Sequence, residues 1–364
     1  GAGACLQDVL AQRRLAACIF AHRALEHAGR QLAWSSVRRA SRSAHCSTDA
    51  VREERLYLAG GSRRQLGADD DVVRTSECLD LQSGRWGAVP DMGTGRSGHV
   101  GVVLGGCLFV CGGRSPRGRS AMRFSPASQF WSTLRPMARP RAFAAGVATN
   151  GSLYVLGGGD ADHVWGSAER LDPRGAAGEW SSLPGIMTPR RSFAAAELRG
   201  GIIMCGGCNV TGSDRLGAVI SLASSAEVFF PATNVLEALP RMRWPRVGHA
   251  AATFRGLLYV FGGLDPRAGH ALSSVEVYDP SAGAWYECPS MAMTRPVYNH
   301  AATVLAGQVY IIGGFRQNRP GSPAESSVQR MDLAASAWET LEPMESGRAA
   351  FCVGVVALGP MSAV

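Results

Sequence analysis

The chain has 364 residues, of which 46% are apolar and 18% are charged, and its net charge is +8. This length and apolar content can bury one large core or two ordinary ones. All 37 basic residues are arginine, which excludes every chemistry that needs a lysine, such as a Schiff base or the lysine of a phosphate-binding loop. The longest apolar run, residues 349–358, is about half of the ~20 residues that cross a membrane, so we expect no membrane association.

Cysteine usage and charge distribution restrict the compartment and the partners. The ten cysteines form no paired framework of the kind found in small disulfide-stabilised domains, so we expect a reducing compartment, the cytoplasm first and the nucleus second. Residues 1–50 carry a net charge of +4, and the other 314 residues share the remaining +4. A charge this mild over the larger part of the chain argues against a nucleic-acid partner.

The first part of the chain is predicted to be helical. Residues 6–37 contain no proline and are rich in alanine, leucine and arginine, so we expect a helical segment over residues 1–37. The polar stretch that follows, residues 38–54, is predicted to be a linker. The sequence begins at Gly1 rather than at methionine, which we interpret as the start of a fragment.

A repeat occupies the rest of the chain. An apolar, β-rich stretch that ends in two glycines recurs six times at intervals of 45 to 56 residues, as in LYVFGG. Glycine at a strand end permits a positive φ angle and a close approach of two backbones. The repeated glycines are Gly60, Gly61, Gly112, Gly113, Gly157, Gly158, Gly206, Gly207, Gly262, Gly263, Gly313 and Gly314.

A second strand follows each diglycine, and turn residues separate it from an aromatic position, as is typical of a hairpin. Tryptophan occupies this position in five repeats, as Trp86, Trp131, Trp180, Trp285 and Trp338. The fourth repeat has Leu236 there instead.

The diglycine and tryptophan pattern, from Gly60 to the C-terminus, resembles the kelch repeat. The resemblance implies a β-propeller, in which each repeat forms a four-stranded blade around a central channel. The chain enters at Leu56 with the second strand of a blade and ends, over residues 348–358, with a lone first strand. We therefore predict an all-β fold over residues 55–364, a six-bladed kelch β-propeller closed by the C-terminal strand, preceded by the short α-helical segment.

Several repeated polar residues are interpreted as structural. Three histidines share one repeat position that elsewhere holds alanine or phenylalanine: His99, His249 and His300. Four glutamates share a position on the third strand and are expected to support the adjoining turn: Glu77, Glu169, Glu227 and Glu276. Cys205 and Cys208 have the CxxC spacing, but the residues between them are the glycines of the repeat. We predict no catalytic residue, no metal site and no cofactor.

Function is expected on the propeller face with the longer loops, because rigid scaffolds place binding residues on loops. Arginine recurs there 16 residues before the diglycine. Two roles stay open for these arginines: supporting the backbone of a blade, or binding a ligand. Arginine forks suit carboxylates and phosphates, so the expected ligand is an acidic or phosphorylated peptide. The predicted partner-binding residues are Arg96, Arg141, Arg190, Arg191, Arg246, Arg295 and Arg348.

Further arginines of the same loops add charge to this face: Arg63, Arg64, Arg114, Arg117, Arg119, Arg215, Arg267, Arg316 and Arg319. Aspartates partly offset them, at residues 69–71, 160 and 162.

Residues 14–34, RLAACIFAHRALEHAGRQLAW, resemble the second half of an F-box, including its Leu-x-Trp ending at Leu32 and Trp34. An F-box implies docking to Skp1. The end of the BACK helices of a BTB-kelch protein, which implies a cullin partner, and an unrelated helical leader are the alternatives. The favoured hypothesis is a substrate receptor of a cullin-RING ubiquitin ligase that does no covalent chemistry itself. A kelch scaffold in cytoskeletal or signalling assemblies is the second hypothesis, and a propeller enzyme is the third.

Overall fold

The structure, a computed structural model, describes residues 53–65, 71–114, 118–174, 178–183, 185, 187–209, 223–305, 307–333 and 336–358. They belong to the compact unit Arg52–Val364. The predicted helical segment, residues 1–37, lies outside the described residues, as does nearly all of the predicted linker. The 3-10 turn η2 (Pro289–Met291) lies after strand β19 (Ala284–Glu287), and no helix of the described residues is long and apolar enough to cross a membrane.

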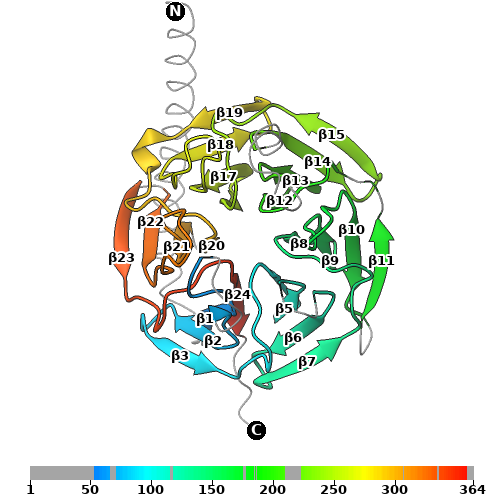
Figure 1. Cartoon of the computed structure of the whole chain (residues 1–364), viewed down its shortest axis with the longest axis vertical. Helices are drawn as coiled ribbons and strands as arrows, with labels where there is room; N and C mark the ends of the chain where they lie inside the picture. The colour runs from blue at the N-terminus through cyan, green and yellow to red at the C-terminus, as the bar shows by residue number, and fades with distance from the viewer. Residues whose placement is uncertain are drawn as a thin grey trace, which may run out of the picture. The chain divides into compact units, whose positions relative to one another are not determined.

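The described strands form six sheets, each with four antiparallel strands, arranged as blades around a central axis (Figure 1). This arrangement confirms the all-β, six-bladed propeller predicted from the repeat. From the innermost strand outward, blade 1 consists of β24 (Cys352–Leu358), β1 (Glu53–Ala59), β2 (Ser76–Asp80) and β3 (Trp86–Val89). Blade 2 consists of β4 (Val100–Leu104), β5 (Cys107–Cys111), β6 (Ala121–Ser125) and β7 (Phe130–Leu134).

The other four blades repeat this order. Blade 3 consists of β8 (Ala145–Thr149), β9 (Ser152–Leu156), β10 (Ala168–Asp172) and β11 (Glu179–Leu183). Blade 4 consists of β12 (Ala194–Leu198), β13 (Gly201–Cys205), β14 (Ala226–Phe230) and β15 (Val235–Leu239). Blade 5 consists of β16 (Ala250–Phe254), β17 (Leu257–Phe261), β18 (Val275–Asp279) and β19 (Ala284–Glu287). Blade 6 consists of β20 (Ala301–Leu305), β21 (Gln308–Ile312), β22 (Val328–Asp332) and β23 (Ala337–Leu341).

Blade 1 is assembled from both ends of the propeller sequence. Strand β24 pairs antiparallel with β1 over seven residue pairs, from Glu53 opposite Leu358 to Ala59 opposite Cys352. This is the pairing expected from a chain that enters with a second strand and ends with a first strand. It satisfies the backbone of two strands that would otherwise be exposed edges.

The core lies between neighbouring blades, because each sheet packs against the preceding blade on one face and against the following blade on the other. The second strands are therefore almost continuously apolar and buried, as in β9 and β13, whose five residues are all buried. One cluster joins Tyr57 of blade 1 to Phe124 and Trp131 of blade 2. The tryptophans of the repeat also connect blades through their indole N–H groups.

Each of the five tryptophan side chains donates a hydrogen bond from Nε1 to a backbone carbonyl of the preceding blade. The acceptors lie just after that blade's outer strand, at distances of 2.7 to 3.1 Å: Glu342 for Trp86, Pro90 for Trp131, Arg135 for Trp180, Pro240 for Trp285 and Met291 for Trp338. Leu236 of blade 4 cannot make this bond, and 40% of its surface is exposed.

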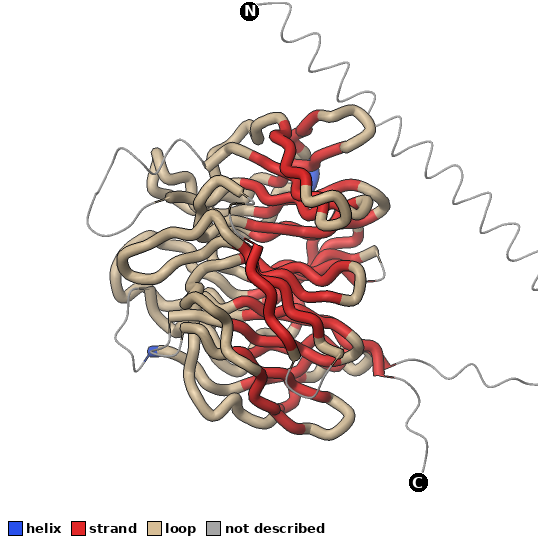
Figure 2. Tube along the Cα trace, turned by 90° about the vertical axis from the view of Figure 1, so that its right-hand side faces the viewer, coloured by secondary structure: helices blue, strands red, loops and turns tan. Residues whose placement is uncertain are grey.

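The two faces of the propeller differ in their connections. In blades 2 to 5 the first and second strands are joined by two-residue turns, such as Asn150 and Gly151, whose φ angles of 50° and 69° fit the tight turns of hairpins. The connections from second to third strands and from one blade to the next are longer, and all of them emerge on the opposite side. We call this side the loop face; Figure 2 shows its long loops gathered on one side of the strands.

A ring of six backbone hydrogen bonds encircles the channel on the loop side of the inner strands. Its members occupy one position in each blade and all have φ between 51° and 62°: Gly98, Phe143, Ser192, Gly248, Asn299 and Ala350. Each N–H donates to the carbonyl of the equivalent residue in the preceding blade, at 2.6 to 2.8 Å, and Gly98 donates to Ala350. The ring therefore closes on itself and joins all six blades.

Candidate functional site

Five arginines that recur in register before the diglycines lie inside the blades. We call them the in-register arginines: Arg96, Arg141, Arg190, Arg246 and Arg348. Their exposed fractions are between 0 and 2%. In each case Nη1 donates to the carbonyl of the first glycine of the diglycine in the same blade, at 2.7 to 3.4 Å. Each guanidinium therefore satisfies a backbone carbonyl that the turn leaves without a partner.

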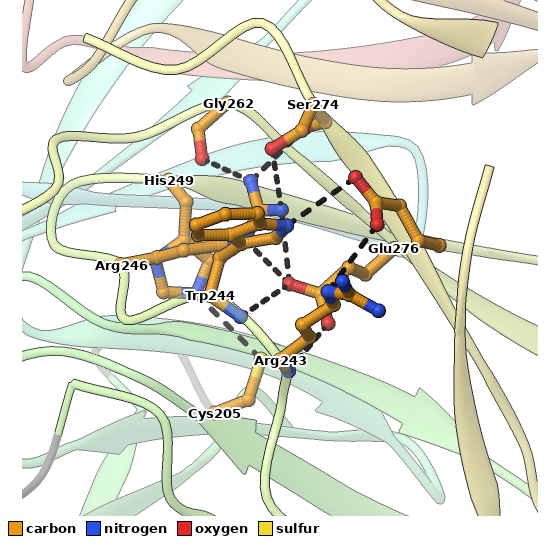
Figure 3. A network of polar contacts seen from close by, with 9 residues as sticks. Cys205, Arg243, Trp244, Arg246, His249, Gly262, Ser274 and Glu276 are labelled. Atoms are coloured by element: carbon orange, nitrogen blue, oxygen red, sulfur yellow. Dashed lines mark hydrogen bonds and ion pairs between the residues drawn. The ribbon is translucent and has the colours of Figure 1, made fainter. Parts of the chain in front are cut away.

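Arg246 of blade 5 shows the complete arrangement (Figure 3). Its Nη1 donates to the carbonyl oxygens of Gly262 and Ser274, and its Nε and Nη2 donate to Oε1 of Glu276 at 3.0 and 2.9 Å. Glu276 also accepts backbone N–H groups of Arg243 and Trp244 at 2.7 and 3.2 Å. Burial lowers the pKa of Arg246, and the charge of Glu276 opposes this effect. The pair ties the connection between blades 4 and 5 to strand β18.

Three further blades contain the same pair of residues, namely Arg141 with Glu169, Arg190 with Glu227, and Arg348 with Glu77. The glutamates thus support the adjoining turns, as expected. Five of the seven arginines for which the sequence predicts partner binding are accordingly held inside the blades. Of the two roles left open for them, the structure supports the one in which they support the backbone, because the guanidinium groups are already used by buried carbonyls and carboxylates.

The other two predicted partner-binding residues lie nearer the surface. Arg191 is half-buried and lines a cavity on the loop face. The side chain of Arg295 is 46% exposed and lies 3.4 Å from Glu325. Arg295 stands two residues before Val297, which takes the in-register position in blade 6.

The cavity that Arg191 lines has a volume of about 600 Å³. Loops of blades 2, 3 and 4 form it, and its polar lining includes Arg114, Asp160 and Arg191, while Phe143 and Cys208 also contribute. Arg114 is exposed. Two arginines beside an open, partly apolar cavity can bind a carboxylate or phosphate group that is attached to an apolar chain.

The wall of this cavity in blade 3 is pre-ordered. Asp160 Oδ1 accepts the backbone N–H groups of Asp162 and His163 at 3.0 and 2.8 Å. Desolvation acts in the opposite direction, but these bonds keep the pKa of Asp160 below its usual value, so the carboxylate is charged at neutral pH. The ring of His163 stacks on Trp165 with centroids 5.1 Å apart, and the Arg139 guanidinium lies 4.5 Å from the centroid of the same indole.

Other exposed arginines surround the loop face. They come from the connections between second and third strands: Arg63, Arg64, Arg114, Arg119, Arg267, Arg316 and Arg319. Arg117 and Arg215 lie outside the described residues. The sequence predicts these residues only as additional charge, because their positions do not recur in the repeat register. Register, however, marks residues that satisfy the recurring backbone, whereas residues that vary from blade to blade are the ones left free to bind.

The three repeated histidines line a smaller cavity, of about 110 Å³, in the central channel. Each covers the first glycine of the preceding blade; a Cβ added to Gly206 would lie 2.4 Å from His249 Cε1. Phe193 and Phe351 do the same elsewhere, which supports the interpretation of a packing position. Burial lowers the pKa of His99 and His249 to about 3 and that of His300 to about 4, so all three are neutral at physiological pH.

The CxxC pair is divided between two environments. Cys205 is buried, its Sγ lies 3.6 Å from His249 Nε2, and burial raises its pKa to about 12. Cys208 lines the loop-face cavity, and its backbone exchanges two hydrogen bonds with Arg191 at 2.8 and 2.9 Å. No group of three or more His, Cys, Asp or Glu side chains within the described part of the chain is placed to hold a metal ion.

The fold, the diglycines and the interblade tryptophans together define a six-bladed β-propeller built from kelch-type repeats. Residues 95–138, 140–187, 245–292 and 296–345, more than half of the chain, match the family model of the Kelch motif. The chain therefore belongs to the kelch-repeat family.

Three relatives illustrate the range of similar proteins. Kelch-like protein 33 of Homo sapiens is 33% identical over 148 residues, which are 39% of this chain and 26% of that protein. Kelch-like protein 34 of Homo sapiens is 26% identical over 287 residues, 74% of this chain and 43% of that protein. An F-box/kelch-repeat protein of Arabidopsis thaliana is 25% identical over 267 residues, 65% of each. The chain thus spans less than two thirds of the length of each of these relatives.

Proposed function

We propose that this protein is a protein-interaction module that serves as the substrate receptor of a cullin-RING ubiquitin ligase, and that its loop face binds an acidic or phosphorylated peptide. The observation that carries the binding proposal is the cavity of about 600 Å³ between Arg114 and Arg191. Both side chains present N–H donors beside an apolar wall that includes Phe143. A peptide with one carboxylate or phosphate group next to an apolar residue matches this lining.

The ligase part of the proposal is supported by relatives whose names include F-box/kelch-repeat and kelch-like proteins, and by the F-box resemblance of residues 14–34. In this role the N-terminal segment docks Skp1 or a cullin, and the propeller presents the substrate. The cytoplasm, with the nucleus as the second compartment, is the proposed location. A kelch scaffold without a ligase partner is the second candidate, and it uses the same loop face.

Charge reversal on the two faces tests the binding proposal. The variant Arg114→Glu/Arg191→Glu is expected to lose binding to glutamate-rich and phosphoserine-containing peptide libraries by at least about tenfold, since each charge-assisted hydrogen bond is worth roughly 1.5–3 kcal/mol. The matched control is Arg199→Glu, because Arg199 is exposed in a turn between first and second strands on the opposite face. Equal binding by both variants would contradict the proposed site.

Affinity purification of the full chain from cells tests the ligase proposal separately. Recovery of Skp1 together with a cullin supports an F-box receptor, and recovery of a cullin without Skp1 supports a BTB-type receptor. A substrate-bound chain recovered with neither would contradict the ligase role and favour the scaffold.

A further inference from the structure

Blade 2 contains a buried arginine without a carboxylate partner. Arg96 is 2% exposed, and its Nη1 donates to the carbonyl oxygen of Gly112 at 3.2 Å. Its Nη2 lies 3.5 Å from the sulfur of Met122, and its Nε has no hydrogen-bond partner. No described carboxylate lies within ion-pair distance of it, whereas the other four in-register arginines each contact a glutamate.

Met122 occupies the strand position that those glutamates hold. Met122 of β6 lies opposite Val110 of the neighbouring strand. In the same way, Glu169 of β10 lies opposite Val155, and Glu276 of β18 lies opposite Val260. A thioether sulfur is only a weak hydrogen-bond acceptor. The guanidinium of Arg96 is therefore desolvated without the oxygen acceptor that this position supplies in four other blades, which is an unfavourable arrangement for a buried charge.

Met122 is also the most exposed of the described methionines. The other described methionines are at most 6% exposed, whereas Met122 is half-buried. Thioether oxidation requires contact between the sulfur and the oxidant, so exposure ranks methionines by their reactivity. The most exposed methionine of the described chain is thus the one whose sulfur contacts a guanidinium with an unpaired N–H group.

We propose that Met122 is a site of reversible oxidation by hydrogen peroxide, and that Arg96 stabilises its sulfoxide. In this step the sulfur lone pair attacks one peroxide oxygen, the O–O bond breaks and an S–O bond forms. The sulfur is oxidised by two electrons, and the proton on the transferred oxygen moves to the leaving oxygen, which departs as water. The sulfoxide oxygen then accepts a hydrogen bond from Arg96, as a glutamate oxygen does in the other blades.

The consequence is opposite to that of most methionine oxidation, which disrupts apolar packing. The carbonyl of Arg96 accepts the backbone N–H of Gly61 at 2.9 Å, so this residue joins blade 2 to blade 1. A hydrogen bond from the Arg96 guanidinium to the sulfoxide oxygen would fix this side chain and so stabilise the contact between the two blades. Oxidation at Met122 is therefore expected to stabilise the propeller.

Graded treatment of the full chain with hydrogen peroxide, followed by peptide mapping and thermal unfolding, tests the proposal. Met122 is expected to be the first described methionine to gain one oxygen, with a rise in Tm of about 2 °C. A methionine sulfoxide reductase should return both the mass and the Tm to their starting values. Earlier oxidation of the buried methionines, or a fall in Tm that follows the Met122 sulfoxide, would overturn the proposal.

Two variants at position 122 test whether the change in Tm depends on this methionine. Met122→Leu keeps the packing and every cysteine but has no sulfur at this position, so peroxide should leave its Tm unchanged. Met122→Glu supplies the missing carboxylate and is expected to unfold at a higher temperature than the untreated protein, with no further gain from peroxide. An equal peroxide response of Met122→Leu and the unaltered chain would refute a role for Met122.

Discussion

Residues that recur in register in this chain satisfy the backbone that recurs with them. In five of the six blades, the first glycine of the diglycine leaves a carbonyl inside the blade, and the in-register arginine donates to it. In four of these blades a glutamate neutralises the arginine and accepts N–H groups from the connection between blades. In blade 6, Val297 and Gln329 replace both members of the pair, whereas blade 2 keeps Arg96 and has Met122 in place of the glutamate.

Replacing Arg246 alone is expected to be severely destabilising. Arg246→Val leaves Glu276, which is 0% exposed, as an uncompensated buried charge, so the free energy of unfolding should fall by about 3–5 kcal/mol. The double variant Arg246→Val/Glu276→Gln installs the neutral pair of blade 6 and should lose less than the sum of the two single changes. Urea denaturation of all four proteins measures this coupling, and strictly additive losses would contradict it.

The three buried histidines predict an acid-sensitive fold. Desolvation keeps their pKa values at about 3 to 4, whereas the unfolded chain titrates near 6.5. Between these values the unfolded chain binds more protons than the folded chain, so the stability that is present above pH 6.5 is lost as the pH falls towards 4. Each histidine contributes up to about 1.4 kcal/mol per pH unit to the free energy of unfolding.

Replacing His99, His249 and His300 by phenylalanine, the residue at the same position in blades 4 and 1, should flatten this dependence. Urea denaturation at pH 7, 6 and 5 measures the slope for both proteins. The carboxylates are common to both and act as the internal control. Parallel slopes would show that the histidines are not held neutral.

At the scale of the element, each blade is an antiparallel sheet. In five blades a tryptophan of the outer strand donates a hydrogen bond to the preceding blade. The indole supplies both apolar area and one N–H donor, as Trp131 does by packing on Phe124 and donating to Pro90 at 2.7 Å. Blade 4 lacks this hydrogen bond, because Leu236 occupies the tryptophan position. Blades therefore tolerate the loss of one such contact when the inner strands and the ring of backbone hydrogen bonds remain.

Trp131→Leu, which copies blade 4, is expected to lower the free energy of unfolding by about 2–4 kcal/mol through lost packing and the lost hydrogen bond. Trp131→Phe keeps most of the apolar contact and should lose roughly half of that amount. Thermal and urea unfolding distinguish the two contributions. Equal stability of the phenylalanine variant and the original chain would mean that the indole N–H contributes nothing.

At the scale of the whole propeller, closure depends on the last strand. Strand β24 completes blade 1, Arg348 supplies its buried cation, and Ala350 completes the ring of backbone hydrogen bonds around the channel. One short segment thus contributes to three separate closing interactions. Until they form, blade 1 lacks its innermost strand, which lies between the inner strands of blades 2 and 6.

Truncation after Gly347 is expected to remove these interactions together. The shortened chain should unfold at a markedly lower temperature, bind hydrophobic dyes and associate through the exposed edge of β1. A synthetic peptide of residues 348–358 added in trans should restore the original Tm, whereas a scrambled peptide should not. A truncated chain with an unchanged Tm would contradict closure by this strand.

Periodicity explains how much of the fold could be predicted from the sequence. Six diglycines at intervals of 45 to 56 residues predict six blades, and the phase of the two chain ends predicts the pairing of β24 with β1. The packing role of His249 also follows from sequence, because alanine and phenylalanine share its position. These inferences succeed because a repeat reports the same local environment several times.

The repeat could not show which of the candidate arginines are available to bind a partner. Spacing places Arg246 and Arg191 on connections of the same face, but only the packed blades show that Arg246 is buried against Glu276 while Arg191 lines an open cavity. The contact between Arg96 and Met122 was equally hidden, because Arg96 lies on the connection between blades 1 and 2 and Met122 lies in strand β6, 26 residues later. Burial depends on which segments meet across loops, and that is a property of three-dimensional packing.

By itself, the sequence determined the repeat, the number of blades and the absence of lysine, since each is a matter of composition or period. Tertiary structure alone decided which of the described arginines are internal supports and which lie on the exposed loops of the loop face. The physical reason is that a guanidinium is drawn inward wherever the fold leaves carbonyls or a carboxylate unsatisfied, and it stays in solvent wherever the backbone is already paired.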